Sequence, residues 1–496
     1  MNVAVIGGGA SGILTVKRLV DALKEAGSSQ GVAIDIFEKQ AERGGLAYQS
    51  SQDSTLTMNG PISNMSAFKE DPGHLHRWLC CADRRRWPEG MKERTFDPAD
   101  YCPRILFRLY LEDILDSAIA DGAAAGVCVR TLAGEVLEVD RPGSRPWRLV
   151  SRSATHRGSR QRDYSKVVLA SGHLDPALPD AVTDAPSQPG ARSRVKVVDC
   201  PAALSRICSE VGSRARVMVL GCGLTAVDFL HLRYKVQHHE GPTVVLAREG
   251  QLPVVYPDGF RPEIARKVQP RRAGPAHPEA VLDWLQDELD TARREGHHPE
   301  QAFRVLRKEV ARKMEGWSLE AKQRFLRRYR KLDRYRTGMP PASGRMISML
   351  LNEDRLAFTT GEIRKIVLRD DAVRVEMSSG LGGEYDAVVA CTGFLFDVHR
   401  TRHPVMRSLL ARRRIEAHPL ELGIQVDPEL RAAPGLFALG PLIQGFLFET
   451  RGVLGTGQSI VGIRAQAVRV GRAIAREITE SGAGPRAVGH DAAMRP

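Results

Sequence analysis

Two short glycine-rich segments constrain the fold of this chain more than any other feature, because each stands between a β-rich apolar run and a helical pattern. In the first, VIGGGASG, the residues Gly7, Gly9 and Gly12 give the spacing G-x-G-x-x-G. The first glycine permits a tight turn, the second lets the backbone approach a pyrophosphate, and the third allows close helix packing. The next predicted strand ends in Glu38, whose carboxylate can accept hydrogen bonds from a ribose diol. The sequence therefore predicts a βαβ nucleotide-binding unit at this point.

The second segment, VLGCGLTA, repeats the arrangement, with Gly221, Gly223 and Ala226 in the spacing G-x-G-x-x-A. The strand after it, PTVVLAREG, ends in Arg248, where the first unit has its acid. A guanidinium pairs bidentately with a 2′-phosphate but gains little from a ribose diol. A solvated arginine at the end of a strand is the alternative interpretation. We therefore expect a second dinucleotide unit that prefers NADPH to NADH.

Two dinucleotide units in one chain suggest that a nicotinamide reduces a flavin, with FAD on the first unit and NADPH on the second. Disulfide reductases place a C-x-x-C pair beside the flavin, and none of the eight cysteines here forms that pattern. Molecular oxygen is then the natural electron acceptor. The cysteines, including the adjacent Cys80 and Cys81, are expected to be reduced and mostly buried packing residues, and no metal-ligand spacing recurs.

The predicted fold is α/β, with two Rossmann-like dinucleotide-binding domains, the second inserted into a discontinuous first. Between residues 270 and 341 the composition is helical and basic, and short alternating segments resume afterwards. The segment 455–478 is expected to form a closing amphipathic helix that packs against the first unit. The expected boundaries are 1–200 and 345–480 for the FAD-binding domain, 201–344 for the NAD(P)H-binding domain with its helical insertion, 481–496 for a disordered tail, and 184–194 and 257–278 for linkers.

Composition limits the classes of protein that this chain can belong to. Its 496 residues are 42% hydrophobic, without the run of about 20 apolar residues that a membrane span needs. The first strand begins at Val3, which leaves no room for a secretory signal ahead of it. We expect a soluble cytoplasmic protein.

The formal charge of +13 raises the question of a nucleic-acid partner, above all in the segment FLRRYRKLDRYR. The spacing of Phe325, Tyr329 and Leu332 instead predicts a helix with one buried face and one solvated basic face. No nucleic-acid motif accompanies the charge, so we expect no nucleic-acid partner. Excess arginine also suits an anionic cofactor or substrate, for which Arg334, Arg336 and Arg345 are candidates on charge alone.

Beyond the glycine turns, the chain resembles the FAD/NAD(P)-binding family typified by the FAD-dependent urate hydroxylase and by aspartate N-monooxygenases. The resemblance covers nearly the whole chain and rests on five segments: GGGASG; GGLAYQ with LTMNGPISNMSAFKEDPGHLHRWL; YCPRILFRLYLEDIL; GCGLTAVDFL with LAREGQLP; and VVACTGF with GLFALGPLIQGFLFET. More distantly, ASGH at 170–173 and CTGF at 391–394 are similar to the turns that link the two domains of N-hydroxylating monooxygenases. The resemblance implies oxygen transfer through a flavin C4a-(hydro)peroxide.

The resemblance also implies site residues. Asn59 and Met65 would line the flavin, and Gly45 of GGLAYQ would contact FAD. Arg104 would contact the isoalloxazine or pyrophosphate, with a surface salt bridge as the alternative. Gly440 stands in a Gly-Pro where many related flavoproteins have Gly-Asp, so backbone N–H groups would have to hold the ribityl chain.

A departure from the family pattern follows. Where the family shows a run close to W-E-T-T-A-V-P, this chain has F-E-T-R-G-V-L, so Phe448, Arg451 and Gly452 differ. The segment is expected to face the flavin, and Arg451 is a candidate for the active-site lining. Glu449 would be either a polar substrate contact or a structural acid. The departure bears on substrate identity more than on cofactor identity.

Three functions are compatible with the sequence. The first is a monooxygenase that N-hydroxylates an amine or amino acid, or hydroxylates a purine, with oxygen and a small, anionic substrate as partners. The second is a flavoprotein reductase or dehydrogenase that passes electrons to a partner or a quinone. The third is a non-catalytic nucleotide-sensing protein. A homo-oligomer is compatible with all three.

Overall fold

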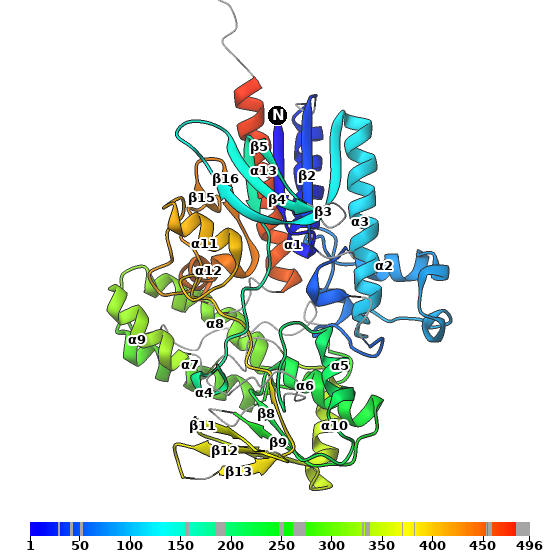
Figure 1. The fold of residues 1–496 in the computed structure, drawn as a ribbon, viewed down its shortest axis with the longest axis vertical. Helices are drawn as coiled ribbons and strands as arrows, with labels where there is room; N and C mark the ends of the chain where they lie inside the picture. Colours follow the sequence, from blue (N-terminus) through cyan, green and yellow to red (C-terminus); the bar gives the residue numbers. More distant parts are fainter. Residues whose placement is uncertain are drawn as a thin grey trace, which may run out of the picture.

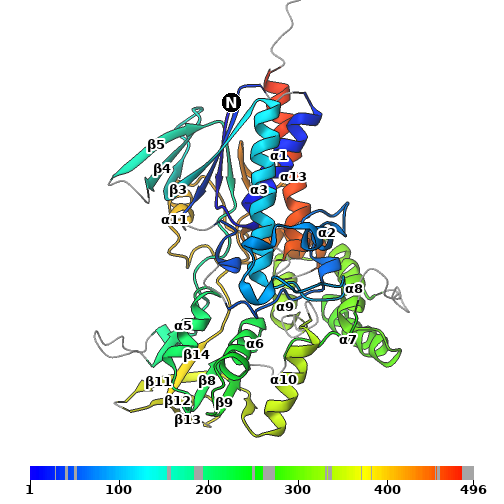
Figure 2. The same cartoon turned by 90° about the vertical axis from the view of Figure 1, so that its right-hand side faces the viewer.

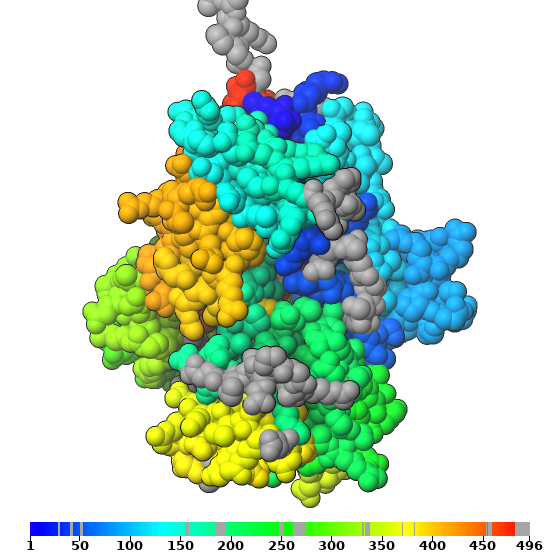
Figure 3. Space-filling view, in the orientation of Figure 1, coloured from blue at the N-terminus to red at the C-terminus, as the bar shows by residue number. Residues whose placement is uncertain are grey.

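The chain folds around two sheets that lie one above the other along the long axis of the molecule (Figures 1 and 2). The computed structural model describes residues 1–27, 30–39, 43–49, 53–153, 158–183, 194–247, 252–260, 274–329, 332, 338–369, 371–380, 382–452, 454 and 459–482. In the space-filling view the part around the first sheet (blue, cyan and orange) sits above the part around the second (green and yellow) (Figure 3). The α/β fold with two units that the glycine segments predict is confirmed.

The first sheet has eight strands in the order β15-β16-β6-β1-β2-β3-β4-β5. Its strands are β1 (Asn2–Ile6), β2 (Val32–Glu38), β3 (Val127–Asp140), β4 (Trp147–Ser153), β5 (Ser159–Tyr164), β6 (Lys166–Leu169), β15 (Arg431–Ala433) and β16 (Leu436–Ala438). Neighbours from β16 to β3 are parallel, and the outer strands on either side are antiparallel. Parallel strands are buried on both faces, as the apolar run of β1 requires.

Three helices cover one face of this sheet: α1 (Ala10–Glu25), α3 (Arg104–Ala125) and α13 (Ile460–Gly482). They stand side by side in Figure 2, with α1 in contact with both of the others. A Cβ on Gly471 would lie 2.8 Å from the backbone carbon of Arg18, so α13 approaches α1 closely. The expected closing helix against the first unit is therefore confirmed.

The second sheet is parallel throughout and has the order β10-β9-β8-β14-β7. Its strands are β7 (Val195–Val197), β8 (Val217–Leu220), β9 (Thr243–Leu246), β10 (Leu356–Thr359) and β14 (Ala387–Ala390). A separate antiparallel sheet contains β11 (Ile363–Leu368), β12 (Val373–Met377) and β13 (Gly382–Tyr385). The accompanying helices are α4 (Asp180–Thr183), α5 (Ala203–Glu210), α6 (Leu224–His231) and α10 (Pro341–Asn352).

The helical insertion contains α7 (Pro278–Arg294), α8 (Pro299–Met314) and α9 (Leu319–Tyr329). Phe325, Tyr329 and Leu332 are buried, as the predicted amphipathic helix requires. They pack in one cluster with Phe448 of α12 (Gln444–Arg451), so the insertion is joined to the C-terminal part of the chain. Two further helices belong to this part of the molecule: α11 (Pro404–Ala411) packs on β3, and α2 (His74–Cys81) lies beside α3 (Figure 1).

The chain crosses between the sheets twice, and the crossings lie beside each other. Leu395 N–H donates to Asp175 O at 2.8 Å, and Ala177 N–H donates to Gly393 O at 2.9 Å. The expected segment 345–480 therefore contains strands of both sheets. β10 and β14 belong to the second sheet, whereas β15 and β16 belong to the first. Alternating hydrophobicity predicts strands but does not say which sheet a strand joins.

The structure also bears on the predictions for the cysteines and for membrane spans, whereas most of the expected tail and linkers is not described. Residues 483–496 of the expected tail, and most of the two expected linkers, lie outside the described residues. All eight cysteines are free, but only Cys102, Cys208 and Cys391 are buried, so the prediction of mostly buried cysteines is wrong. The prediction that Cys80 and Cys81 are packing residues is also wrong, because both are exposed. Cys80 and Cys81 end the short helix α2, whose buried residues are Leu75 and Leu79. None of the described helices is both long and apolar enough to cross a bilayer.

Candidate functional site

The first glycine turn has the geometry that its spacing predicts. Gly7 has a φ of +113°, and its N–H donates to Phe37 O at 2.8 Å. A Cβ on Gly7 would lie 2.3 Å from Ala170 O, and one on Gly12 would lie 1.9 Å from Gly7 O. The helix α1 begins after Gly9, and no side chain caps its N-terminus. The first backbone N–H groups of the helix are therefore left for a ligand. This is the arrangement that binds a pyrophosphate at a helix N-terminus.

Two segments brace this turn. Glu38, only 8% exposed, accepts a hydrogen bond from Gly8 N–H at 2.9 Å. Gly44 N–H donates to Gly8 O at 3.1 Å, and a Cβ on Gly45 would lie 2.8 Å from Gly9 Cα. The structure therefore brings Gly45 and Glu38, both predicted to bind the cofactor, against the glycine turn.

Two buried polar atoms without partners lie farther along the carboxyl edge of the same sheet. Ser171 Oγ follows β6, beside the turn, and Gln466 Nε2 lies on α13. Gln466 Oε1 accepts the Gly440 N–H at 2.7 Å, so this backbone N–H, expected to hold the ribityl chain, is already used. Gln466 leaves its own amide nitrogen as the buried donor there. Nothing in the sequence singles out Gln466, because it lies in a helix remote from the Gly-Pro pair.

These groups fit an extended dinucleotide such as FAD. The glycine turn supplies backbone N–H groups and close approach, while Ser171 and Gln466 supply unpaired polar atoms farther along the edge. Buried polar groups are nearly always hydrogen-bonded, and an unpaired group at a candidate site points to a missing partner.

The two segments expected to line the flavin pair with each other. Met58 N–H donates to Cys102 O at 2.8 Å, and Arg104 N–H donates to Leu56 O at 2.9 Å. Met65 is buried, and Asn59 is half-buried.

Arg104 joins the two units. Its Nη1 lies 2.7 Å from Asp228 Oδ2 on α6, and its Nε donates to Thr57 O at 3.0 Å. The Arg104 side chain is 9% exposed, so this ion pair is buried and is not the surface salt bridge that was the alternative. Thr55 Oγ1 and His231 Nε2 lie 2.8 Å apart, which gives α6 a second contact with the first unit. Arg104 therefore fixes the position of the second nucleotide unit.

The second glycine turn matches the first. Gly221 has a φ of +97°, its N–H donates to Leu246 O at 2.9 Å, and a Cβ there would lie 2.5 Å from Cys391 O. Gly223 caps α6 without a side-chain hydrogen bond, and a Cβ on it would meet no atom within 4 Å. Ala226 is fully buried against the sheet. Arg248 lies outside the described residues.

The turns that follow β6 and β14 meet at the junction of the two units. The His173 ring stacks on the Phe394 ring, with centroids 4.2 Å apart and planes 20° apart. His173 Nδ1 and Thr392 Oγ1 are buried without a partner. Burial lowers the pKa of His173 to about 4, so the ring is neutral at physiological pH.

Glu449 is held in an ion cluster. Its carboxylate lies 2.7 Å from Lys322 Nζ and 3.3 Å from Nε2 of the buried His418. The hydrogen bonds with His418 and Lys322 outweigh burial and lower the pKa of Glu449 to about 2. A Cβ on Gly445 would lie 2.2 Å from the His418 ring, so the helix turn is built around this histidine. These contacts match the structural acid among the two expected roles.

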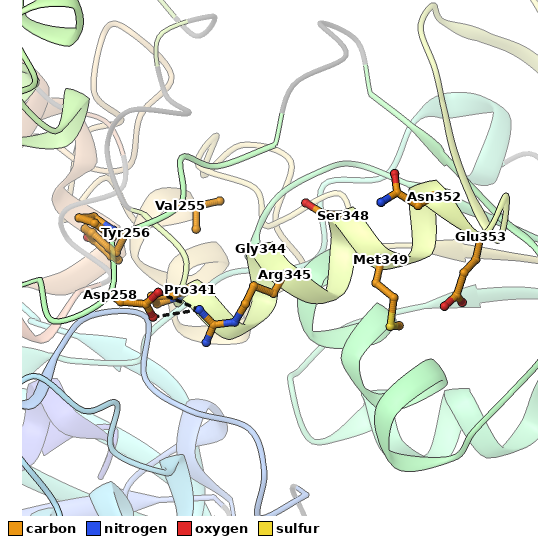
Figure 4. A pocket seen from close by; sticks show the side chains of 11 residues that line it. Val255, Tyr256, Asp258, Pro341, Gly344, Arg345, Ser348, Met349, Asn352 and Glu353 are labelled. Carbon is orange, nitrogen blue, oxygen red and sulfur yellow. Dashed lines mark hydrogen bonds and ion pairs between the residues drawn. The ribbon is translucent and has the colours of Figure 1, made fainter.

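Only one of the three arginines proposed for an anionic substrate lies among the described residues, because Arg334 and Arg336 lie outside them. Arg345 pairs with Asp258 at 2.9 Å in a groove of about 620 Å³ (Figure 4). This groove is lined by the segment 255–258 and by α10, and by no residue of either glycine turn.

Comparison with known proteins agrees with this site. Residues 4–174 match the protein family described as FAD-NAD(P)-binding. This part of the chain, which contains the first glycine turn, is therefore similar to FAD/NAD(P)-binding domains. The chain is also 28% identical over 204 residues to the L-aspartate N-monooxygenase (nitrosuccinate-forming) of Streptomyces davaonensis, a match that covers 37% of this chain and 31% of that enzyme.

Solved structures extend the likeness over both units. The Kutzneria sp. 744 ornithine N-hydroxylase with reduced FAD, NADP⁺ and L-ornithine has a TM-score of 0.58 at 16% identity, covering 96% of this chain and 99% of that one. The FAD-bound cadaverine monooxygenase of Erwinia amylovora has a TM-score of 0.56 at 12% identity, covering 100% and 98%. The chain thus has the fold of these two monooxygenases over nearly its whole length.

Proposed function

We propose that this protein is a monooxygenase that uses FAD and NADPH to oxygenate a small nitrogen-containing metabolite, by N-hydroxylation of an amine or amino acid. The observation that carries the proposal is the pair of matched glycine turns, at Gly7 and Gly221, joined by the buried ion pair between Arg104 and Asp228. The free cysteines support it, because they leave no disulfide to receive electrons. They also favour a reducing compartment such as the cytoplasm.

The residues have separate tasks in this proposal. When bound, FAD would supply the redox chemistry that links NADPH to oxygen, and the protein would supply binding and orientation. The turn at Gly7 binds the pyrophosphate, and Glu38 keeps the Gly8 amide and the turn in place. Gln466 donates from its buried Nε2 to a polar atom of the cofactor. The pair Arg104–Asp228 holds α6, and with it the second nucleotide unit, against the first unit, which would hold the flavin.

Substrate panels with and without oxygen test the proposal. Purified protein should carry FAD, NADPH should bleach it without oxygen, and oxygen with the right substrate should give an oxygenated nitrogen product. L-Aspartate, L-ornithine, L-lysine, cadaverine and urate are the first candidates. Reduction by NADPH without an oxygenated product, but with electron transfer to a quinone, would support the reductase instead. A protein that does not take up FAD would contradict both.

A further inference from the structure

Four arginines gather where the helical insertion meets the first unit, and we call them the arginine cluster. Arg304 and Arg307 lie on α8, Arg451 ends α12, and Arg464 lies near the start of α13. All four are half-buried. Figure 2 shows α13 pointing its first turns toward the helical insertion.

Direct packing holds part of the cluster together. Gly452 follows Arg451 with a φ of +60°, and a Cβ on it would lie 2.0 Å from Arg307 O. The Tyr329 hydroxyl donates to Gly452 O and fixes this contact from the side of α9. Arg307 Nε donates to Arg304 O at 3.3 Å. The backbones that carry Arg307 and Arg451 therefore touch, and glycine at 452 is needed for that approach.

The cluster holds more positive than negative charge. Arg304 pairs with Glu300 at 2.6 Å, and the same carboxylate accepts the Tyr256 hydroxyl. Within the described part of the chain, no carboxylate pairs with the other three arginines. Arg464 donates from Nη1 to Ser66 O at 2.7 Å, and its buried Nε has no partner.

Burial and neighbouring positive charge disfavour the charged forms of three of these arginines. Burial, and then the nearness of Arg304, lower the pKa of Arg307 to about 10. Burial also lowers the pKa of Arg451, and burial with the nearness of Arg304 lowers that of Arg464. A lowered pKa means that the fold disfavours the charged form of these side chains. Charge strain of this kind concentrates at ligand sites.

The position of the cluster connects it with the flavin unit. Ser66, which holds Arg464, follows Met65 in the segment expected to line the flavin. Arg464 also stands two residues before Gln466, the buried donor at the carboxyl edge. Arg451 belongs to the F-E-T-R departure, in which this chain has a cation where the family pattern has threonine. The glycine turns, which would hold the pyrophosphates, contain none of the four arginines, so the cluster is available for a different anion.

We propose that the arginine cluster binds a carboxylate of the nitrogen-bearing substrate and selects anionic substrates against cationic amines. Two adjacent guanidinium groups offer planar pairs of N–H donors that match a carboxylate, and they repel an ammonium group at the same place. This assignment deepens the proposed function and rests on it.

The test is calorimetric titration of the FAD-loaded protein without NADPH, using succinate, inorganic phosphate and cadaverine at one ionic strength. We expect succinate to bind at least about tenfold more tightly than the other two. The variants R307Q and R451Q should each weaken succinate binding at least about tenfold. R312Q is the matched control on α8, because Arg312 is 71% exposed and pairs with Glu309, and it should change binding less than about twofold.

If the arginines only stabilised the fold, their substitution would lower the unfolding temperature. We expect R451Q to unfold at the same temperature as the wild type or above it, because the substitution relieves repulsion while it removes the anion contact. R307K and R451K keep the positive charge but lose the planar pair of guanidinium N–H donors. They should therefore weaken succinate binding less than the glutamine variants do. Equal binding of succinate and cadaverine, phosphate binding as tight as that of succinate, or unchanged binding by R307Q and R451Q would overturn the proposal.

Failure of this inference is separable from failure of the proposed function. The titration needs no flavin reduction, and reduction of the bound FAD by NADPH is measured in a separate sample. Normal reduction with no succinate binding contradicts the carboxylate site alone. Succinate binding that requires Arg307 and Arg451, in a protein that NADPH cannot reduce, contradicts the monooxygenase alone.

Discussion

The two glycine turns of this molecule share one backbone design. Gly7 and Gly221 both have positive φ angles, of +113° and +97°. Each donates its N–H to the last residues of the next strand, at 2.8 Å and 2.9 Å. Each also packs against the carbonyl of a neighbouring strand end, where a Cβ would come within 2.3 Å and 2.5 Å. The same hydrogen bond and the same steric exclusion of a side chain thus hold both turns in one conformation.

The surroundings of the turns differ. Around the first, Glu38 holds the Gly8 N–H, and Gly45 leaves no room for a side chain beside Gly9. Around the second, a Cβ on Gly223 would meet nothing within 4 Å. An enclosed turn suits a cofactor that stays bound, whereas an open one suits a cofactor that must enter and leave. The comparison therefore supports resident FAD on the first unit and exchangeable NADPH on the second.

Alanine at the third position of the first turn should have the largest effect. In G12A the new Cβ would lie 1.9 Å from Gly7 O, so we expect a loss of about 3 kcal/mol or more in the free energy of unfolding, together with loss of FAD. The second unit already has alanine there, as Ala226. Urea unfolding and the flavin absorbance of the purified protein measure both effects. A G12A protein with normal FAD content would show that the turns are not packed as described.

Removal of the brace around the first turn should have a smaller effect. E38A leaves the buried Gly8 N–H without its charged acceptor, so we expect FAD affinity to fall by about 2 kcal/mol, or roughly thirtyfold. NADPH affinity should stay within about twofold, because the second turn makes no contact with Glu38. E25A, in the last turn of α1 and exposed, is the control. Equal losses for both cofactors would remove the distinction between the turns.

The ion pair between the units tests how the two sites cooperate. R104Q and D228N should each slow reduction of the bound FAD by NADPH about tenfold, equivalent to about 1.4 kcal/mol, without changing FAD content. The double variant should be little slower than either single one, because the two side chains act as one contact. Stopped-flow reduction measures all three. Additive losses would mean that Arg104 and Asp228 act separately.

The smallest expected effect concerns His173 and its counterpart Phe394 in the second unit. Burial lowers the pKa of His173 from 6.5 to about 4. Between these values the unfolded chain binds a proton that the folded protein does not, so stability falls as the pH falls. From pH 6.5 to 5.5 the wild type should lose about 1 kcal/mol more than H173F. Equal losses in urea titrations would contradict the buried neutral ring.

Local patterns predicted the parts of this fold that depend on neighbours in sequence. The glycine turns, the amphipathic face of α9 and the helix α13 follow from spacing alone. Spacing could not predict the partners of Arg104 and Gly440, because Asp228 and Gln466 lie in other elements of the chain. The arginine cluster likewise forms only when α8 packs on α12, so charge alone pointed to Arg345, which pairs with Asp258 instead.

The most direct test of the account compares the same substitution in the two turns, by mixing each purified protein with NADPH in the absence of oxygen. G7A should lack FAD, whereas G221A should carry FAD that NADPH reduces at least about a hundredfold more slowly than in the wild type. G90A is the control, because Gly90 lies outside both turns and a Cβ on it would meet no atom within 4 Å, and it should keep both its FAD and its reduction by NADPH. Loss of FAD in G221A, or normal reduction by NADPH in that variant, would contradict the assignment of the two cofactors to the two units.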